Sequence, residues 1–198
     1  ADAQTAGRGC SGRSWHSAPG LGLWLSVSLR GAAAGLTSAG ALAVRDAARS
    51  GARLTVRWPN DLVCAGRKVA GVLVEHRNGW NAIGIGINVH HFPEDFPPEL
   101  RETAGSLQYL TGRAWDRAAL LCGVLRMLDR RVAQLRDGRG REMQEEWAAA
   151  CGVLGRRVRQ GDITGEAAAL DEDGALLVRS GGRMHRLVRG PIAYADGA

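Results

Sequence analysis

The segment that decides the fold is Arg57-Trp-Pro-Asn-Asp-Leu-Val-Cys-Ala-Gly-Arg-Lys-Val-Ala-Gly-Val-Leu-Val-Glu75. Its apolar, valine-rich runs are separated by the turn-forming residues Pro59-Asn60-Asp61 and Ala65-Gly66, a pattern that predicts strands joined by turns. The segment also holds Lys68, the one lysine among 26 Lys and Arg residues. A lysine carries a compact charge on a thin stem and can enter a pocket too narrow for the arginine fork. Lys68 is therefore the first candidate for chemistry, although a drift toward arginine that spared one lysine explains the count equally well.

The strand through Lys68 suggests where that lysine points. Side chains of a strand alternate between its two faces, so we expect Lys68 to share a face with Ala70 and Val72 and to lie opposite Gly71. The preceding Pro59-Asn60-Asp61 is typical of an ordinary turn. Neither observation alone separates a functional lysine from a structural one.

Hydrophobic patterning outside this segment divides the chain into two parts. Alternating or valine-rich runs predict strands, and apolar residues at helical spacing predict helices. In the first part we expect strands over 21–29, 54–58, 68–75 and 82–89, helices over 37–49, 116–136 and 141–150, and a loop over 90–105. Short strands with Asp-Gly and Gly-Gly turns follow over 156–160, 163–170, 175–179, 184–188 and 192–195. The pattern predicts an α/β (α+β) domain over residues 1–151, with a mixed β-sheet flanked by helices, and a small β-barrel over residues 152–198.

Composition argues against several classes of protein. The chain has 198 residues, 45% hydrophobic and 23% charged, which is ordinary for a globular protein. Apolar runs stay well short of the ~20 residues of a membrane span, so we expect a cytoplasmic protein without membrane contact. The four scattered cysteines predict free thiols and no metal site. A net charge of +6 suits a phosphate-bearing ligand or an acidic protein, whereas the scattered arginines do not predict a nucleic-acid face.

Two glycine-rich motifs flank the Lys68 segment. The first, Gln4-Thr-Ala-Gly-Arg-Gly-Cys-Ser-Gly-Arg-Ser-Trp15, can bring backbone N–H groups and arginine forks against an anion, although a solvated loop would look the same. The second, Ile83-Gly-Ile-Gly-Ile-Asn88, places two glycines on one face of a strand. That leaves either a groove for a flat ligand or room for a closely packed helix. Each motif is ambiguous when taken alone.

In this order and spacing, the motifs together resemble those of biotin protein ligases, also called biotin-[acetyl-CoA-carboxylase] ligases. The matching stretches are Ala3-Gln-Thr-Ala-Gly-Arg-Gly9, Gly12-Arg-Ser-Trp15, Arg57-Trp-Pro-Asn-Asp61, Gly66-Arg-Lys-Val-Ala-Gly-Val-Leu-Val-Glu75, Gly84-Ile-Gly-Ile-Asn88 and Leu170-Asp-Glu-Asp-Gly-Ala-Leu-Leu177. The resemblance covers nearly the whole chain. It implies a catalytic domain like those of class II aminoacyl-tRNA synthetases and biotin ligases, followed by an SH3-like C-terminal barrel.

The resemblance also implies an activity and roles for particular residues. The family joins biotin to AMP from ATP, releases pyrophosphate, and passes biotin to one lysine of a biotin carboxyl-carrier protein, with Mg²⁺ arriving on the phosphates. Lys68 and Arg8 would be the cations of the adenylation step, and we infer that Asp61 lies near the incoming lysine. The residues that would line the biotin and adenylate site are Gln4, Arg8, Gly9, Cys10, Arg13, Trp15, Lys68, Gly84, Gly86 and Asn88.

Two departures from the family pattern limit this transfer. The family usually has arginine where this chain has Cys10, in the loop that folds over the intermediate, so we expect the adenylate to escape faster. Relatives also carry an upstream strand and helix with a Ser-Thr-Asn motif that contacts biotin, and the sequence, which opens at Ala1, contains none of it. We therefore expect either a fragment of a longer chain or an incomplete site. These residues also supply no winged-helix DNA-binding domain, which some members carry.

Other interpretations stay open at this point. A lipoate ligase or octanoyltransferase shares the fold and acylates carrier lysines, although Trp58-Pro-Asn-Asp61 argues against it. An inactive module that only docks carrier domains fits the missing Ser-Thr-Asn segment, while Lys68 and the glycine-arginine loop argue against it. A basic nucleic-acid binder is the third alternative. The sequence also leaves open which carrier protein is modified and whether the chain forms a homodimer.

Overall fold

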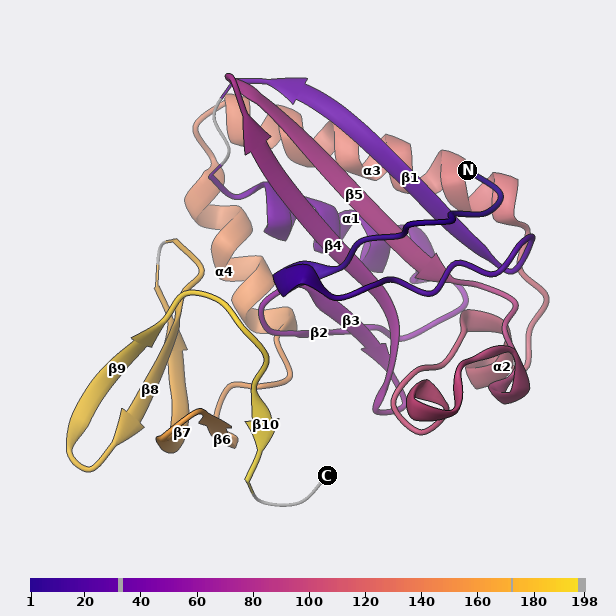
Figure 1. Ribbon diagram of the computed structural model, residues 1–198. Coiled ribbons are helices and arrows are strands. Elements are labelled where there is room, and N and C mark those ends of the chain that lie inside the picture. The colour runs from indigo at the N-terminus through magenta and orange to yellow at the C-terminus, as the bar shows by residue number, and fades with distance from the viewer. Residues whose placement is uncertain (32–33, 172, 196–198) are drawn as a thin grey trace.

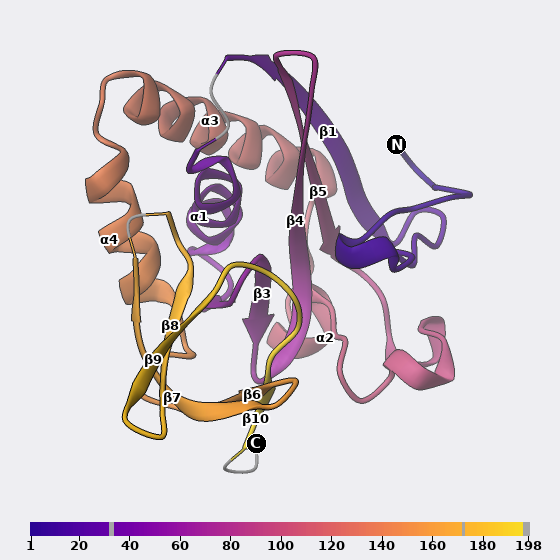
Figure 2. The ribbon, with the colours of Figure 1, turned by 60° about the vertical axis from the view of Figure 1, so that its left-hand side comes forward.

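A computed structural model describes residues 1–31, 34–171 and 173–195 of the chain. Its larger part is built on a five-stranded antiparallel sheet in the order β1-β5-β4-β3-β2. The strands are β1 (Gly22–Arg30), β2 (Thr55–Arg57), β3 (Asp61–Cys64), β4 (Arg67–Arg77) and β5 (Trp80–Asn88). α1 (Leu36–Ala48) packs on one face, α3 (Arg117–Arg136) packs against α1, and the N-terminal segment crosses the opposite face (Figure 1). Figure 2 shows the helices and the N-terminal segment on opposite sides of the sheet.

The face of the sheet that meets the helices is apolar because its strands alternate. It is formed by Leu23, Leu25, Val27 and Leu29 of β1, Ile83, Ile85 and Ile87 of β5, and Ala70, Val72 and Val74 of β4. α1 meets this layer at Gly40, where an added Cβ would lie 2.8 Å from Cγ1 of Val72. The helix therefore lies close to the sheet, and the opposite face is left free to build a site.

One strand of the sheet is not predicted by the sequence pattern. The pattern predicts only a turn over 59–61, but β3 begins at Asp61 and pairs with both β2 and β4. Asp61 has two cross-strand partners, Arg57 on β2 and Gly71 on β4. The predicted turn is thus only the tip of a hairpin whose second strand continues the sheet.

A β-bulge in the β3–β4 ladder corrects the expected orientation of Lys68. Regular alternation would place Lys68 with Ala70 and Val72, but the register shifts and leaves Val69 without a ladder partner. An extra residue in one strand reverses the alternation beyond it. Lys68 consequently lies on the face of Gly71, where an added Cβ would be 3.4 Å from Cε of the lysine. The expectation that Lys68 shares a face with Ala70 and Val72 is wrong.

The segment between β5 and α3 covers one end of the sheet. It contains two short 3-10 turns, Pro93–Asp95 and Pro98–Leu100, and the short helix α2 (Leu107–Thr111), which the sequence does not predict. Ser106 caps α2 by accepting a hydrogen bond from the Tyr109 N–H at 3.1 Å. Asn88 ties the segment to β5, since its amide donates to the Gly105 carbonyl at 3.0 Å.

A second antiparallel sheet follows α4 (Gly140–Ala150) and has the order β10-β6-β7-β8-β9. Its strands are β6 (Arg157–Gln160), β7 (Ile163–Leu170), β8 (Leu176–Ser180), β9 (Arg183–Leu187) and β10 (Ala193–Tyr194), which confirms the five strands predicted after residue 152. Trp58, 2% exposed, donates its indole N–H to the Gly174 carbonyl at 2.9 Å. The mixed α+β architecture is confirmed, while the division into domains at residues 151 and 152 stays a prediction.

The helices α1, α3 and α4 are joined by an ion cluster. Arg131 of α3 contacts Asp46 of α1 and Glu146 of α4, both at 2.5 Å, and Arg45 also pairs with Glu146. Hydrogen bonds from Arg131 lower the pKa of Glu146 despite its partial burial. All four cysteines are free. In the part of the chain that the structure describes, no helix is long and apolar enough to cross a membrane.

Candidate functional site

A cavity of about 460 Å³ opens on the sheet face that the helices leave free. The sheet provides its floor, and the N-terminal segment and residues 96–104 provide its walls. Every residue that the sequence predicts for the site lines this cavity: Gln4, Arg8, Gly9, Cys10, Arg13, Trp15, Asp61, Lys68, Gly84, Gly86 and Asn88. The fold therefore brings the three sequence motifs together, while the roles of the individual residues stay predictions.

Lys68 reaches into the cavity from β4. Its Nζ lies 2.6 Å from Oδ1 of Asp61 and 5.0 Å from the centroid of the Trp15 ring. The Lys68 side chain is 27% exposed and that of Asp61 is 19% exposed, so water screens the pair only in part. An ammonium beside a carboxylate and an aromatic ring can bind an incoming anion by exchanging one partner for another.

The floor beside Lys68 is made of glycine. A Cβ added to Gly71 would lie 2.9 Å from the Trp15 ring, and one added to Gly86 would lie 2.6 Å from it. Trp15 therefore rests directly on the backbone of β4 and β5, whereas the nearest neighbour of such a Cβ at Gly84 is 3.5 Å away. Gly84 and Gly86 face the cavity and not the helices. Of the two alternatives that the sequence leaves open for these glycines, the structure has the cavity over them, and Trp15 covers its Gly86 end.

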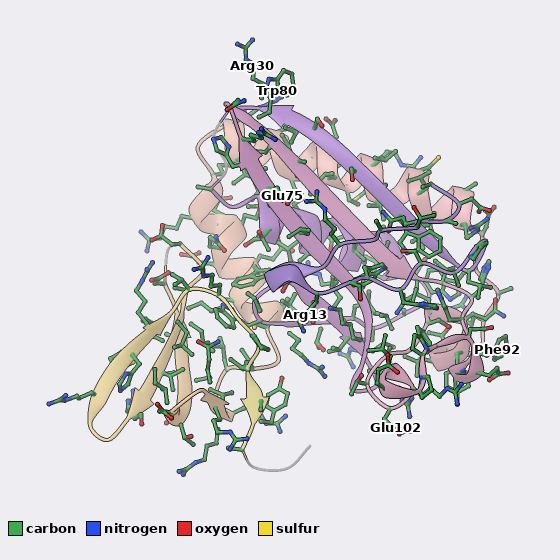
Figure 3. All side chains as sticks on the ribbon, viewed as in Figure 1. Arg13, Arg30, Glu75, Trp80, Phe92 and Glu102 are labelled. Carbon is green, nitrogen blue, oxygen red and sulfur yellow. The ribbon has the colours of Figure 1, made fainter. Side chains whose placement is uncertain are left out.

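The arginines of the N-terminal loop lie at the rim of the cavity. Arg8 forms an ion pair with Glu75 of β4 at 2.7 Å, and its side chain is 72% exposed. Arg13 donates from Nε to the Cys10 carbonyl at 3.2 Å. Figure 3 shows Arg13 on this loop and Glu75 on the sheet beside it. In this arrangement Arg8 holds the loop against β4 and does not meet Lys68.

Cys10 occupies the inner side of the same loop. Its Sγ accepts a hydrogen bond from Nδ2 of Asn60 at 3.2 Å, and the same amide donates to the Val72 carbonyl at 2.9 Å. Burial raises the pKa of the Cys10 thiol, and the charge of Asp61 raises it further. Position 10 thus presents a neutral thiol, so it adds no positive charge to the cavity.

The amide of Asn88 has a structural task at the edge of the cavity, because it donates to the Gly105 carbonyl. Several residues that line the cavity are not predicted from the sequence, namely His16, Trp24, Arg57, Asn60, Gly71, Glu75 and Phe96. Arg57, Asn60, Gly71 and Glu75 all lie inside the Arg57–Glu75 segment. The signal was therefore available, but only the pairing of β2, β3 and β4 reveals which of them face the cavity.

Comparison with known proteins identifies the family. Residues 1–91 match the biotin/lipoate A/B protein ligase family. Over 210 residues the chain is 32% identical to the biotin-[acetyl-CoA-carboxylase] ligase of Mycobacterium tuberculosis, which covers 98% of this chain and 77% of that protein. The chain belongs to the biotin protein ligase family. It is also 33% identical over 196 residues to the bifunctional ligase/repressor BirA of Bacillus subtilis, covering 91% of this chain but only 60% of that relative's length.

A solved member of the biotin protein ligase family has the same fold. The biotin protein ligase from Aquifex aeolicus, in complex with biotin and ATP, superimposes with a TM-score of 0.85 at 30% sequence identity. The match covers 97% of this chain and 85% of that one. The biotin protein ligase fold therefore extends through both sheets of this chain.

Proposed function

We propose that this chain is an ATP-dependent biotin-protein ligase. It makes biotinyl-5′-AMP from biotin and ATP, and then transfers biotin to a specific lysine of a biotin carboxyl-carrier protein. The observation that carries this proposal is the Lys68–Asp61 pair beside Trp15, in a cavity of about 460 Å³ with a glycine floor. The relatives named as biotin ligases and the neighbour that binds biotin and ATP support it.

The first step requires one anion to attack another. An oxygen of the biotin carboxylate attacks the α-phosphorus of ATP, the new O–P bond forms, and pyrophosphate leaves with the electrons of the broken bond. A fixed cation in a partly dry cavity reduces the repulsion and stabilises the charge that develops. The position of Lys68 supports this role, because its Nζ can turn from Asp61 toward a phosphate oxygen. Trp15, which rests on Gly71 and Gly86, can form a wall beside a ligand that lies over Gly84.

The second step requires a neutral amine. The carrier lysine must lose a proton before its nitrogen attacks the acyl carbon and AMP leaves. Asp61 is engaged by Lys68 at 2.6 Å in the structure, so it can accept that proton only after Lys68 has moved to the phosphate. This exchange would make Asp61 available once the adenylate has formed.

The other components of the proposal follow from the substrates. Mg²⁺ would arrive with the ATP phosphates, and the described residues contain no group of three or more His, Cys, Asp or Glu placed to hold a resident metal ion. Carboxylases that carry biotin supply the acceptor domain, and we expect the reaction in the cytoplasm. The sequence leaves open whether the chain forms a homodimer, and sedimentation at several protein concentrations tests this.

The test uses the purified chain with a biotin carboxyl-carrier domain and ATP with Mg²⁺. Biotin-dependent pyrophosphate release and mass-shifted carrier are the expected results. Lipoate and octanoate are supplied in parallel, and preferential transfer of either would replace the proposal with a lipoate-type ligase. Carrier binding without pyrophosphate release would instead identify an inactive docking module.

A further inference from the structure

A row of residues crosses the floor of the cavity from strand to strand. Arg57 of β2 pairs with Asp61 of β3, which pairs with Gly71 of β4. Gly71 in turn pairs with Gly86 of β5, and Gly86 pairs with Trp24 of β1. Directly paired residues of neighbouring strands project to the same face, and all five line the cavity. The row runs from a cation, through a carboxylate and two glycines, to an indole.

The charges around this cavity are not balanced. Lys68 is paired with Asp61, and Arg8 is paired with Glu75. Two further cations, Arg13 and Arg57, line the cavity, and within the described residues neither lies in an ion pair with a carboxylate. The site therefore keeps an excess of positive charge, which suits an anionic ligand larger than a single carboxylate.

Arg57 is fixed in position, in contrast to Arg13 on the exposed loop. Its Nη2 donates to the Gly66 carbonyl at 2.8 Å, which ties the guanidinium to the β3–β4 turn. Its Nε is buried and has no hydrogen-bond partner among the described residues. A buried donor without an acceptor is unfavourable. Arginine is also the side chain whose planar fork matches two phosphate oxygens at once.

We propose that Arg57 binds the β- and γ-phosphates of ATP and holds pyrophosphate as it leaves. The proposal rests on the proposed function and names a further residue of the same site. In an in-line displacement the leaving group departs opposite the attacking oxygen. With biotin over the open part of the floor at Gly84 and the α-phosphate beside Lys68, the leaving side points across β3 toward Arg57. Arg57 lies one strand beyond Asp61, about 4.8 Å in the pairing direction.

The experiment compares Arg57→Gln with the matched variant Arg67→Gln. Arg67 lies on β4 and is also partly buried, but it bonds the Arg101 carbonyl and Glu102, and neither of these residues lines the cavity. Calorimetry measures the affinity for inorganic pyrophosphate, for ATP and for biotin. Arg57→Gln should weaken binding of pyrophosphate and ATP about 10- to 100-fold and leave biotin binding unchanged. Arg67→Gln should change none of the three by more than about twofold.

Steady-state kinetics supply a second measurement, which would not change selectively for ATP and pyrophosphate if the role of Arg57 were purely structural. In Arg57→Gln the KM for ATP and the inhibition constant of pyrophosphate should rise in parallel, while the KM for biotin stays constant. Arg57→Lys keeps the charge but loses the fork, so it should fall between the parent and Arg57→Gln. This conservative variant also keeps the test valid if thermal unfolding shows that Arg57→Gln is misfolded.

The possible outcomes separate this proposal from the function on which it rests. Parental affinity for pyrophosphate and ATP in a folded Arg57→Gln protein overturns the role of Arg57, even if the parent chain makes biotinyl-AMP. Selective loss of that affinity supports the role. If the parent binds pyrophosphate through Arg57 yet forms no biotinyl-AMP, the phosphate site stands and the ligase function fails.

Discussion

Lys68 depends on its immediate neighbours for its chemistry. The ammonium lies between the Asp61 carboxylate and the Trp15 ring, and Gly71 leaves the space through which its stem passes. A compact, strongly hydrated charge can exchange one oxygen partner for another in that space. A guanidinium is flat and needs room for several N–H groups, so the two cations are not equivalent here.

We therefore expect Lys68→Arg to lose most adenylation although it preserves the charge. Removing one well-placed donor from a developing anion typically lowers the rate about 100- to 1,000-fold, and a misplaced fork should come close to that loss. The measurement is biotin-dependent pyrophosphate release. Arg67→Lys, one residue earlier on β4, is the control and should keep nearly the parental rate. A near-parental rate in Lys68→Arg would show that the lone lysine is an accident of composition.

Position 10 should determine how long the intermediate stays bound. Cys10 is a neutral thiol held by Asn60, so the loop offers the adenylate no charged donor there. A charge-assisted hydrogen bond contributes about 1.5 to 3 kcal/mol, so Cys10→Arg should slow escape of biotinyl-AMP about 10- to 100-fold. Stopped-flow dilution of preformed intermediate measures this off-rate. Cys122→Arg, at an exposed cysteine, should leave it unchanged. Equal off-rates in Cys10→Arg and the parent would remove any role for the thiol in leakage.

At the scale of elements, the sequence predicts periodicity well and pairing poorly. Apolar spacing predicts α1, α3, α4 and all five strands of the second sheet. Apolar spacing does not predict β3, because a strand of four residues is too short to show a clear alternation. It does not predict the neighbouring bulge either, because a bulge depends on the strand that lies opposite. The same limit applies to the site. The motifs predict Lys68 and Asp61, but only the register reveals that Arg57 shares a row with Asp61.

The segment that follows β5 should make stability depend on pH through His91. The ring is fully buried, stacks on Phe96 with centroids 4.8 Å apart, and has no hydrogen-bond partner among the described residues. Burial lowers the pKa of His91 to about 4, the charges of His16 and His90 add to this, and Asp95 opposes it. Below pH ~6.5 the unfolded chain therefore binds a proton more strongly than the folded chain. The free energy of unfolding consequently decreases as the pH is lowered.

That loss should reach about 3 kcal/mol between pH ~6.5 and pH ~4. Urea unfolding at intervals across this range measures it. His91→Phe keeps an aromatic ring against Phe96 and removes the titration, so its stability should vary less with pH. His76→Gln, at an exposed histidine, should keep the parental dependence. The assignment to His91 is wrong if His91→Phe follows the parental curve.

At the scale of the whole molecule, the two sheets are joined by a continuous core. Val158, Leu176 and Val178 of the second sheet belong to the same buried cluster as Val56 of the first sheet and Trp58, which follows β2. Backbone pairing reaches this boundary, since Val56 forms a β-bridge with Cys151 and its carbonyl accepts from the Gly152 N–H at 2.9 Å. A small sheet alone buries little apolar surface, so it gains most of its stability from this junction. The predicted boundary at residues 151 and 152 would then mark a change in sequence pattern, but the parts on its two sides would not unfold separately.

We accordingly expect a single cooperative unfolding transition, with the same midpoint by far-ultraviolet circular dichroism and by tryptophan fluorescence.

Trp58→Phe removes the hydrogen bond to Gly174 and part of a buried ring, so it should lower the free energy of unfolding by about 1 to 3 kcal/mol. The transition should stay single, because both sheets lose the same contact. Trp80→Phe is the matched control, since Trp80 is 50% exposed and projects beside Arg30 at the end of the sheet (Figure 3). It should change stability by less than about 0.5 kcal/mol. Two separated transitions in the parent would show instead that residues 152–198 unfold on their own, and that the boundary read from the sequence is also a boundary of stability.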